Sequence, residues 1–203
     1  MKELILENTY ENKAWKEDLL VMGIDEAGRG PLCGPVVIAA CVFPTNYKNP
    51  YINDSKKLSL KDRELLFKVI EEDALWYSIK VVGPKIIDEL NILEATRSAM
   101  KELSFEYNVE YVLTDAVEID NDSNIPIIKG DAKSISIAAA SILAKVTRDK
   151  IMDEYHLLYP EYEFNKHKGY PTKRHIELIN KYGVIKDLYR FSYKPVTKAR
   201  IRK

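Results

Sequence analysis

The residues best suited to chemistry are two adjacent acids, followed by two glycines that flank an arginine. The segment Gly23–Pro31 reads GIDEAGRGP, and an apolar run leads into Asp25 and Glu26. Adjacent side chains on a regular strand face opposite sides. These two acids therefore share one site only if the strand is bulged or is already turning there, and Gly28 favours a turn. The alternative is that both acids merely solubilise a turn.

Two further acids end apolar runs of the sequence. Asp115 follows Tyr111–Thr114, and Asp131 follows Ile127–Gly130, just before an expected helix that Asp131 could instead cap. Carboxylates gathered at one edge of a sheet would repel each other. Mg²⁺ or Mn²⁺ would relieve that repulsion, because hard cations take oxygen ligands. Two such ions, roughly 4 Å apart, can activate water and stabilise the leaving oxygen in phosphodiester cleavage.

The charged residues are balanced overall but unevenly distributed. The chain has 31 Lys and Arg residues and 31 Asp and Glu residues. Residues 165–203 carry twelve basic residues and two acids, interleaved with four tyrosines and a phenylalanine. A basic segment with stackable rings suits a phosphate backbone and its bases. A solvated helical face is the alternative interpretation of this segment.

The apolar pattern predicts an α/β fold with a mixed sheet. Residues 19–25 and 35–43 are expected to form two neighbouring strands of a hairpin, with further strands at 76–82, 109–115 and 125–128. Helices are expected at 58–75, 85–107 with a break near Asn91, 134–155 and 172–182. We divide the chain into an N-terminal leader (1–18), a catalytic core (19–160) and a basic helical C-terminal extension packed on that core (161–203).

Several classes of protein are excluded at this stage. The longest uncharged run, residues 31–47, contains prolines and falls short of the roughly 20 apolar residues that cross a bilayer. Charged residues throughout the first 18 positions leave no apolar region for a signal peptide. Cys33 and Cys41 have neither disulfide-scaffold nor zinc-site spacing. We therefore expect a cytoplasmic protein with no membrane contact, and a monomer because no coiled-coil seam is visible.

Six motifs, in this order, make the sequence resemble the bacterial ribonuclease HII family, the type 2 ribonucleases H. They span nearly the whole chain: GIDEAGRGP (23–31), NDSKKLS (53–59), DELNIL (88–93), KGD (129–131), IAAASILAKVTRD (137–149) and HKGYPT (167–172). The resemblance implies a ribonuclease H-like fold, with a mixed five-stranded sheet flanked by helices and a C-terminal helical extension. It also implies an endonuclease that cuts the RNA strand of RNA–DNA hybrids and cuts 5′ of ribonucleotides embedded in duplex DNA.

The same resemblance implies particular site residues and products. The products carry 5′-phosphate and 3′-hydroxyl ends, and the cofactors are Mg²⁺ or Mn²⁺, with two ions when substrate is bound. Recruitment by a replication or repair protein is a further expectation. By matching motif positions, the metal-binding catalytic acids are Asp25, Glu26, Asp115 and Asp131. The substrate contacts are a loop that senses the ribose 2′-hydroxyl and a tyrosine that packs on the next sugar, namely Gly28, Arg29, Gly30 and Tyr170.

Three lysines are candidates for phosphate contacts: Lys56, Lys57 and Lys168. Surface solvation is the alternative for each of them, as an ion pair is for Arg29 and a place at the rim of the core is for Tyr170. Two other functions compete with the nuclease. A metal-dependent phosphatase of small esters would leave the basic segment without a purpose, and an RNA-binding module would bind without divalent ions and cleave nothing.

Overall fold

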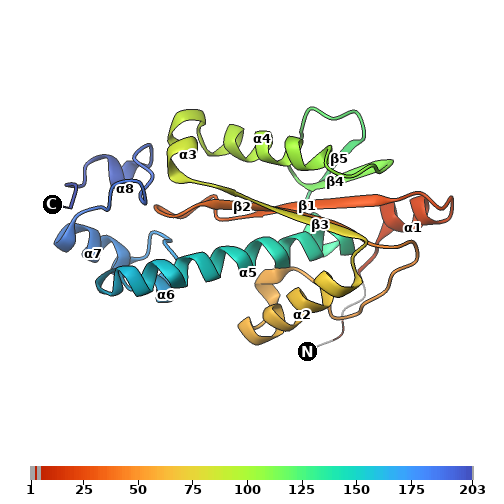
Figure 1. The fold of residues 1–203 in the computed structure, drawn as a ribbon, viewed down its shortest axis with the longest axis horizontal. Coiled ribbons are helices and arrows are strands. Elements are labelled where there is room, and N and C mark those ends of the chain that lie inside the picture. Colours follow the sequence, from red (N-terminus) through yellow and green to blue (C-terminus); the bar gives the residue numbers. More distant parts are fainter. Residues whose placement is uncertain (1–2, 4–5, 203) are drawn as a thin grey trace.

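The computed structural model of this chain describes residue 3 and residues 6–202. In these residues, five strands form a mixed sheet in the order β3-β2-β1-β4-β5 (Figure 1). The strands are β1 (Val21–Ala27), β2 (Val36–Val42), β3 (Trp76–Val82), β4 (Tyr111–Asp115) and β5 (Asn124–Ile127). The pairs β1–β2 and β2–β3 are antiparallel, whereas β1–β4 and β4–β5 are parallel. The predicted mixed five-stranded α/β fold is confirmed.

Helices cover both faces of the sheet (Figure 1). One face packs on α5 (Ile135–Leu158) and α2 (Leu60–Asp73), and the other packs on α4 (Ile92–Ser104), which follows α3 (Pro84–Leu90). The Ser59 hydroxyl caps α2 by accepting a bond from the Asp62 N–H at 3.2 Å. Asn91 separates α3 from α4, has a φ of 67°, and caps α4 with its side chain. The helix break expected near Asn91 is confirmed.

Small residues bring α5 unusually close to the central strand. Gly23 lies on β1, and a Cβ atom added there would lie 2.1 Å from the carbonyl carbon of Ser136. The helix also presents Ala138–Ala140 to the sheet, all fully buried. Because interiors are close-packed, this absence of side-chain bulk sets the distance between α5 and the strand that carries Asp25.

The chain after α5 gathers at one end of the sheet, on the left in Figure 1. It contains α6 (Phe164–His167), α7 (Lys173–Tyr182) and α8 (Lys194–Thr197). These segments share an apolar cluster of their own, which includes Tyr162, Phe164, Ile179, Val184 and Tyr189. None of the helices in the described residues has the length and apolar character needed to span a bilayer.

A short helix, α1 (Thr9–Trp15), lies within the segment that we named the leader. Its Glu11 is fully buried and accepts hydrogen bonds from the Ser134 hydroxyl and, at 3.2 Å, from the Ser136 N–H. Glu11 therefore accepts hydrogen bonds at the N-terminus of α5, where backbone N–H groups have no partner within the helix. A helix of seven residues is too short to form alone, so these tertiary contacts stabilise it.

Candidate active site

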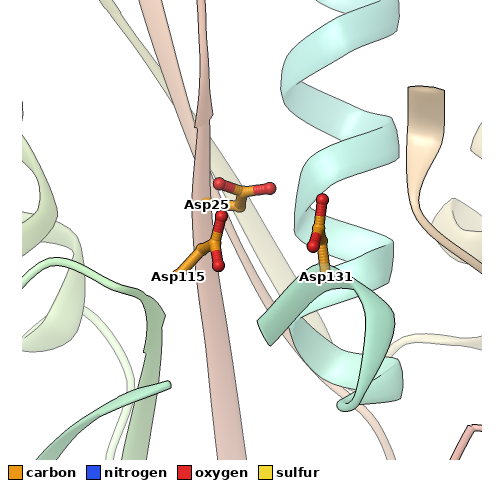
Figure 2. Close-up of side chains that lie close together, drawn as sticks. All are labelled: Asp25, Asp115 and Asp131. Carbon is orange, nitrogen blue, oxygen red and sulfur yellow. The ribbon is translucent and has the colours of Figure 1, made fainter. Parts of the chain in front are cut away.

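Asp25, Asp115 and Asp131 converge at the end of β1 (Figure 2). One carboxylate oxygen from each of them lies within 4.8 Å of those of the other two. Strands β1 and β4 run parallel with Ile24 opposite Thr114, so the next residues bring Asp25 and Asp115 side by side. Asp131 lies on η2 (Gly130–Ala132), the 3₁₀ turn between β5 and α5. The structure thus brings together three of the four acids that the sequence predicted.

Hydrogen bonds to neighbouring segments hold these acids in place. The Gly130 N–H donates to Asp115 Oδ1 at 2.7 Å, which ties the end of β4 to the turn that carries Asp131. Ser141, on α5, opposes the rise in the pKa of the Asp25 carboxyl, and its hydroxyl lies 2.8 Å from the hydroxyl of Ser55. Sequence reasoning missed Ser141; the signal was a lone hydroxyl at a sheet-facing position in a helix of small apolar residues.

Glu26 leaves the strand on the opposite side from Asp25. In the β1–β2 register Asp25 lies opposite Ala39, on the α5 face, while Glu26 lies opposite Ile38, on the α4 face. The register is regular through Ala27, so the chain turns after Glu26 rather than at it. One carboxylate oxygen of Glu26 lies 3.6 Å from an Arg29 nitrogen, and the other is buried without a hydrogen-bond partner among the described residues.

The raised pKa values of these acids show that their negative charges lack compensation, which a bound cation would supply. Burial raises the pKa of Asp25 well above its ordinary value, and the charges of Glu26 and Asp115 raise it further. Burial also raises the pKa of Glu26 to about 7, although Arg29 opposes this rise. Burial and neighbouring acids raise the pKa of Asp131. Together with the unpartnered Glu26 oxygen, these acids fit Mg²⁺ or Mn²⁺, which would neutralise them through oxygen ligands.

These shifts predict how the stability of the metal-free protein depends on pH. In the folded state Asp25 and Glu26 keep protons that the unfolded chain releases above its ordinary pKa values. The unfolded state then binds fewer protons, so stability falls as the pH rises from about 4.5 to 7. Glu26 alone should account for about 2 to 3 kcal/mol at pH 7.5. Thermal unfolding in a chelator should show this fall, and Glu26→Gln should reduce it.

The same thermal unfolding measurement should also be made with divalent ions. Mn²⁺ should raise the melting temperature more at pH 7.5 than at pH 5.5, because cations bind the ionised carboxylates. An equal response at both pH values, or none at either, would contradict a cation site formed by these acids.

The glycine–arginine loop lies next to Glu26 and Tyr170. Gly28 has a φ of +106°, and a Cβ atom there would lie 2.1 Å from the buried Arg148 side chain, so the fold itself requires glycine. At Gly30, in contrast, an added Cβ would meet only the ring of Tyr170, at 3.7 Å. Arg29, Gly30 and Tyr170 are all exposed. They form an exposed surface that is continuous with the acids through the Arg29–Glu26 pair.

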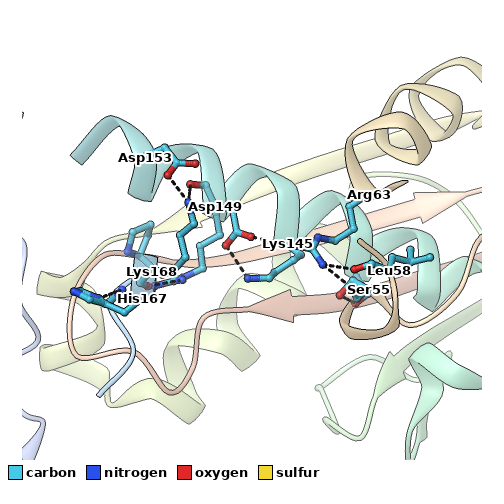
Figure 3. A network of polar contacts seen from close by, with 12 residues as sticks. Ser55, Leu58, Arg63, Lys145, Asp149, Asp153, His167 and Lys168 are labelled. Carbon is cyan, nitrogen blue, oxygen red and sulfur yellow. Dashed lines mark hydrogen bonds and ion pairs between the residues drawn. The ribbon is translucent and has the colours of Figure 1, made fainter. Parts of the chain in front are cut away.

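The structure places the three candidate lysines differently. Lys56, on the 3₁₀ turn η1 (Ser55–Lys57), has its Nζ 3.4 Å from Asp131 Oδ2, with most of the side chain exposed. Lys57 instead lies 4.0 Å from Asp54. Lys168 forms an ion pair with Asp153, on the C-terminal half of α5 (Figure 3). Only Lys56 reaches the three converging acids.

A polar network pins η1 to α5 (Figure 3). Arg63 Nη1 donates to the carbonyl oxygens of Ser55 at 3.0 Å and Leu58 at 2.7 Å. The Asp149 carboxylate lies 3.9 Å from Arg63 and accepts a bond from Lys145 at 2.7 Å. This network fixes the turn that carries Lys56. No local pattern predicts this network, because Arg63 resembles any charged residue on a helix surface.

Comparison with known proteins gives a consistent result. The family model described as Ribonuclease HII matches residues 22–196. The ribonuclease HII of Caldanaerobacter subterraneus subsp. tengcongensis is 55% identical over 179 residues, which cover 86% of this chain and 74% of that protein. The crystal structure of ribonuclease H2 from Pyrococcus horikoshii OT3 superposes with a TM-score of 0.73 at 29% identity, covering 89% of this chain and 96% of that one. The ribonuclease HII of Archaeoglobus fulgidus, solved in complex with PCNA, superposes with a TM-score of 0.74 at 26% identity, covering 87% and 96%.

Proposed function

Because this chain belongs to the ribonuclease HII family, and is therefore a metal-dependent endonuclease, we propose that it hydrolyses the RNA strand of RNA–DNA hybrids and cuts 5′ of ribonucleotides embedded in duplex DNA. The products that we propose carry 5′-phosphate and 3′-hydroxyl ends. The observation that carries this proposal is the convergence of Asp25, Asp115 and Asp131 beside an exposed glycine–arginine loop.

We propose that Asp25, Glu26, Asp115 and Asp131 hold two divalent cations, Mg²⁺ or Mn²⁺, when substrate is bound. Such ions supply an activated water and neutralise charge on the departing 3′-oxygen. Asp25 is the ligand that both ions would share, because it is buried and lies beside Asp115. Although Glu26 lies on the other face of β1, it is close enough for the charge of Asp115 to raise its pKa. Its buried oxygen, which has no partner among the described residues, would complete the site from that side.

The surrounding exposed residues have the chemistry of a substrate surface. RNA differs from DNA by its 2′-hydroxyl, which both donates and accepts hydrogen bonds. We propose that Gly28–Gly30 approaches this hydroxyl or a neighbouring phosphate, and that Lys56 contacts a phosphate. The roles proposed for Lys57 and Lys168 would require each to leave its ion pair with Asp54 or Asp153.

We further propose that residues 19–160 act as the catalytic core and residues 161–203 as a substrate-holding extension. The converging acids lie in the first part and Tyr170 in the second. The A. fulgidus relative was solved with PCNA, and we propose that a replication or repair protein recruits this enzyme too, in the cytoplasm.

One assay tests the central proposal. A DNA duplex with a single embedded ribonucleotide is incubated with Mg²⁺, with Mn²⁺ or with a chelator, and the cut position and end groups are mapped. We expect a cut 5′ of the ribonucleotide only when divalent ions are present. Cleavage of a small phosphate ester in place of the duplex would favour the phosphatase, and metal-independent binding without cleavage would favour the RNA-binding module.

Gly30→Ala tests whether the loop approaches the substrate closely. The fold leaves room for this methyl group, so the melting temperature should stay within about 2 °C of wild type, as for a small surface change. A substrate that packs against Gly30 should be cleaved about 10-fold or more slowly. Unchanged turnover and an unchanged preference for ribonucleotide over all-DNA duplex would contradict the close approach.

Tyr170→Ala tests the proposed packing on a sugar. The ring is 40% exposed and lies beside Gly30, so its loss should weaken substrate contact with little effect on the core. We expect cleavage at a single embedded ribonucleotide to fall about 10-fold, with a smaller effect on uniform hybrids. Tyr170→Phe is the matched control and should retain near-wild-type activity. Equal losses on both substrates would argue against a role at the junction with DNA.

A further inference from the structure

Arg190 lies fully buried behind the glycine–arginine loop, and its hydrogen bonds hold backbone there. Its Nη2 donates to the Gly28 carbonyl oxygen at 2.7 Å, its Nη1 to the Arg29 carbonyl oxygen at 3.0 Å, and its Nε to the Gly34 carbonyl oxygen at 3.0 Å. A guanidinium presents its N–H groups in a rigid planar fork. One side chain therefore fixes the orientation of three peptide groups on both sides of the turn.

Two other residues fasten this arrangement. Tyr193 donates from its hydroxyl to the Arg29 carbonyl oxygen at 2.6 Å and accepts a bond from Arg190 at 3.1 Å. Asp88, on α3, accepts bonds from the backbone N–H groups of residues 191–192 at 2.8 and 2.9 Å. The C-terminal segment is thus anchored to α3 and in turn holds the loop.

These inward bonds determine where the loop directs its donors. In a trans peptide the C=O of one residue and the N–H of the next point in opposite directions, and no described peptide bond is cis. Because the carbonyls of Gly28 and Arg29 point at Arg190, the N–H groups of Arg29 and Gly30 point away from it. Within the described chain neither N–H has an acceptor, and both residues are exposed.

We propose that Arg190, assisted by Tyr193, is a positioning residue that turns the Arg29 and Gly30 N–H groups outward as paired donors for an oxygen of the nucleic acid. That oxygen belongs to the ribose or to an adjacent phosphate. This inference rests on the proposed function and adds to it that the loop is pre-set by the C-terminal segment. Consecutive N–H groups that point the same way form a concavity for oxygen anions, and the fixed positive charge behind them strengthens it.

Two substitutions test this role, with one control. Tyr193→Phe removes a single hydroxyl bond to the loop, whereas Arg190→Lys keeps the charge and loses the planar fork. Tyr77→Phe is the control, because Tyr77 lies on β3, away from the loop, and its hydroxyl donates to Glu71 on α2 at 2.8 Å. The measurements are kcat and KM on the embedded-ribonucleotide duplex, inhibition by an all-DNA duplex of the same sequence, and the Mn²⁺-induced rise in melting temperature.

We expect Tyr193→Phe to lower kcat/KM about 3- to 10-fold, and Arg190→Lys about 10- to 100-fold. Mn²⁺ should still stabilise both variants, because the acids are intact. If kcat/KM falls as expected, unchanged inhibition by all-DNA duplex assigns the donors to the ribose hydroxyl, and weakened inhibition assigns them to a phosphate.

The outcomes that oppose the inference are also distinct. If Tyr193→Phe behaves like Tyr77→Phe while Arg190→Lys loses only thermal stability, Arg190 is a structural residue and the inference is wrong. If the wild-type chain does not cut the ribonucleotide duplex with either metal, the proposed function fails, and the inference fails with it.

Discussion

Asp25→Asn should reduce the turnover of the embedded-ribonucleotide duplex by at least about 1,000-fold. Asp25 is the most enclosed of the converging acids and has Asp115 and Glu26 as charged neighbours. An amide of the same shape keeps the packing but removes the negative charge that a divalent cation requires, and metal-assisted charge stabilisation is worth several kcal/mol. Turnover with Mg²⁺ and Mn²⁺, measured at saturating substrate, gives the result directly.

The same variant should fold at least as well as wild type without metal. The raised pKa of Asp25 shows that its buried charge is disfavoured in the folded state. Removing that charge should therefore raise the melting temperature in a chelator at pH 7.5. Asp122→Asn is the matched control, since Asp122 is exposed in the β4–β5 connection, and it should change neither property. Turnover near that of wild type in Asp25→Asn would remove Asp25 from the active site.

Gly23→Ala should be among the most damaging single-methyl additions that this fold can receive. The new Cβ would lie 2.1 to 2.4 Å from backbone atoms of Ser136 and Ile137, and backbone cannot move aside as the end of a flexible side chain can. We expect a loss of about 3 kcal/mol or more in the free energy of unfolding, at the upper end of overpacking effects. Denaturant unfolding of the purified variant measures this loss.

Gly83→Ala provides the control for that prediction. An added Cβ at Gly83 meets nothing within 4 Å, and Gly83 precedes α3 at its N-terminus. Its cost should stay within about 1 kcal/mol, as expected for a helix N-cap. Equal stability of the two variants would show that α5 can move away from β1 freely. In that case the spacing of Asp25 and Asp131 would not depend on Gly23.

The fold was largely predictable because local patterns agree with the tertiary structure. The cap that Ser59 provides for α2, the break at Asn91 and the end of β4 at Asp115 all have signals within a few residues. The helix α1 has no such signal. It forms because Glu11 and Trp15 find buried partners more than a hundred residues away, and local propensity contains no information about those contacts.

The candidate site divides in the same way. Acids at strand ends can be anticipated, because parallel strands bring their carboxyl ends to one edge. The face on which Glu26 lies depends on how far the β1 register continues, and the sequence left that open. Lysine contacts were the least predictable, because a flexible lysine side chain forms an ion pair with whichever acid is near, as Lys168 does with Asp153. Arg190 lies outside the motifs of the sequence analysis. It contacts the loop through backbone oxygens, which no residue pattern in the sequence indicates.

The wide separation of the site residues along the chain has a consequence for biosynthesis. Asp25 is made before its partners Asp115 and Asp131, which follow 90 and 106 residues later, and the arginine that orders residues 28–30 is residue 190. Parallel pairing of β1 with β4 must await that distant sequence, and such non-local pairings form slowly. A nascent polypeptide on the ribosome therefore cannot complete the site that we propose until residue 190 has been added.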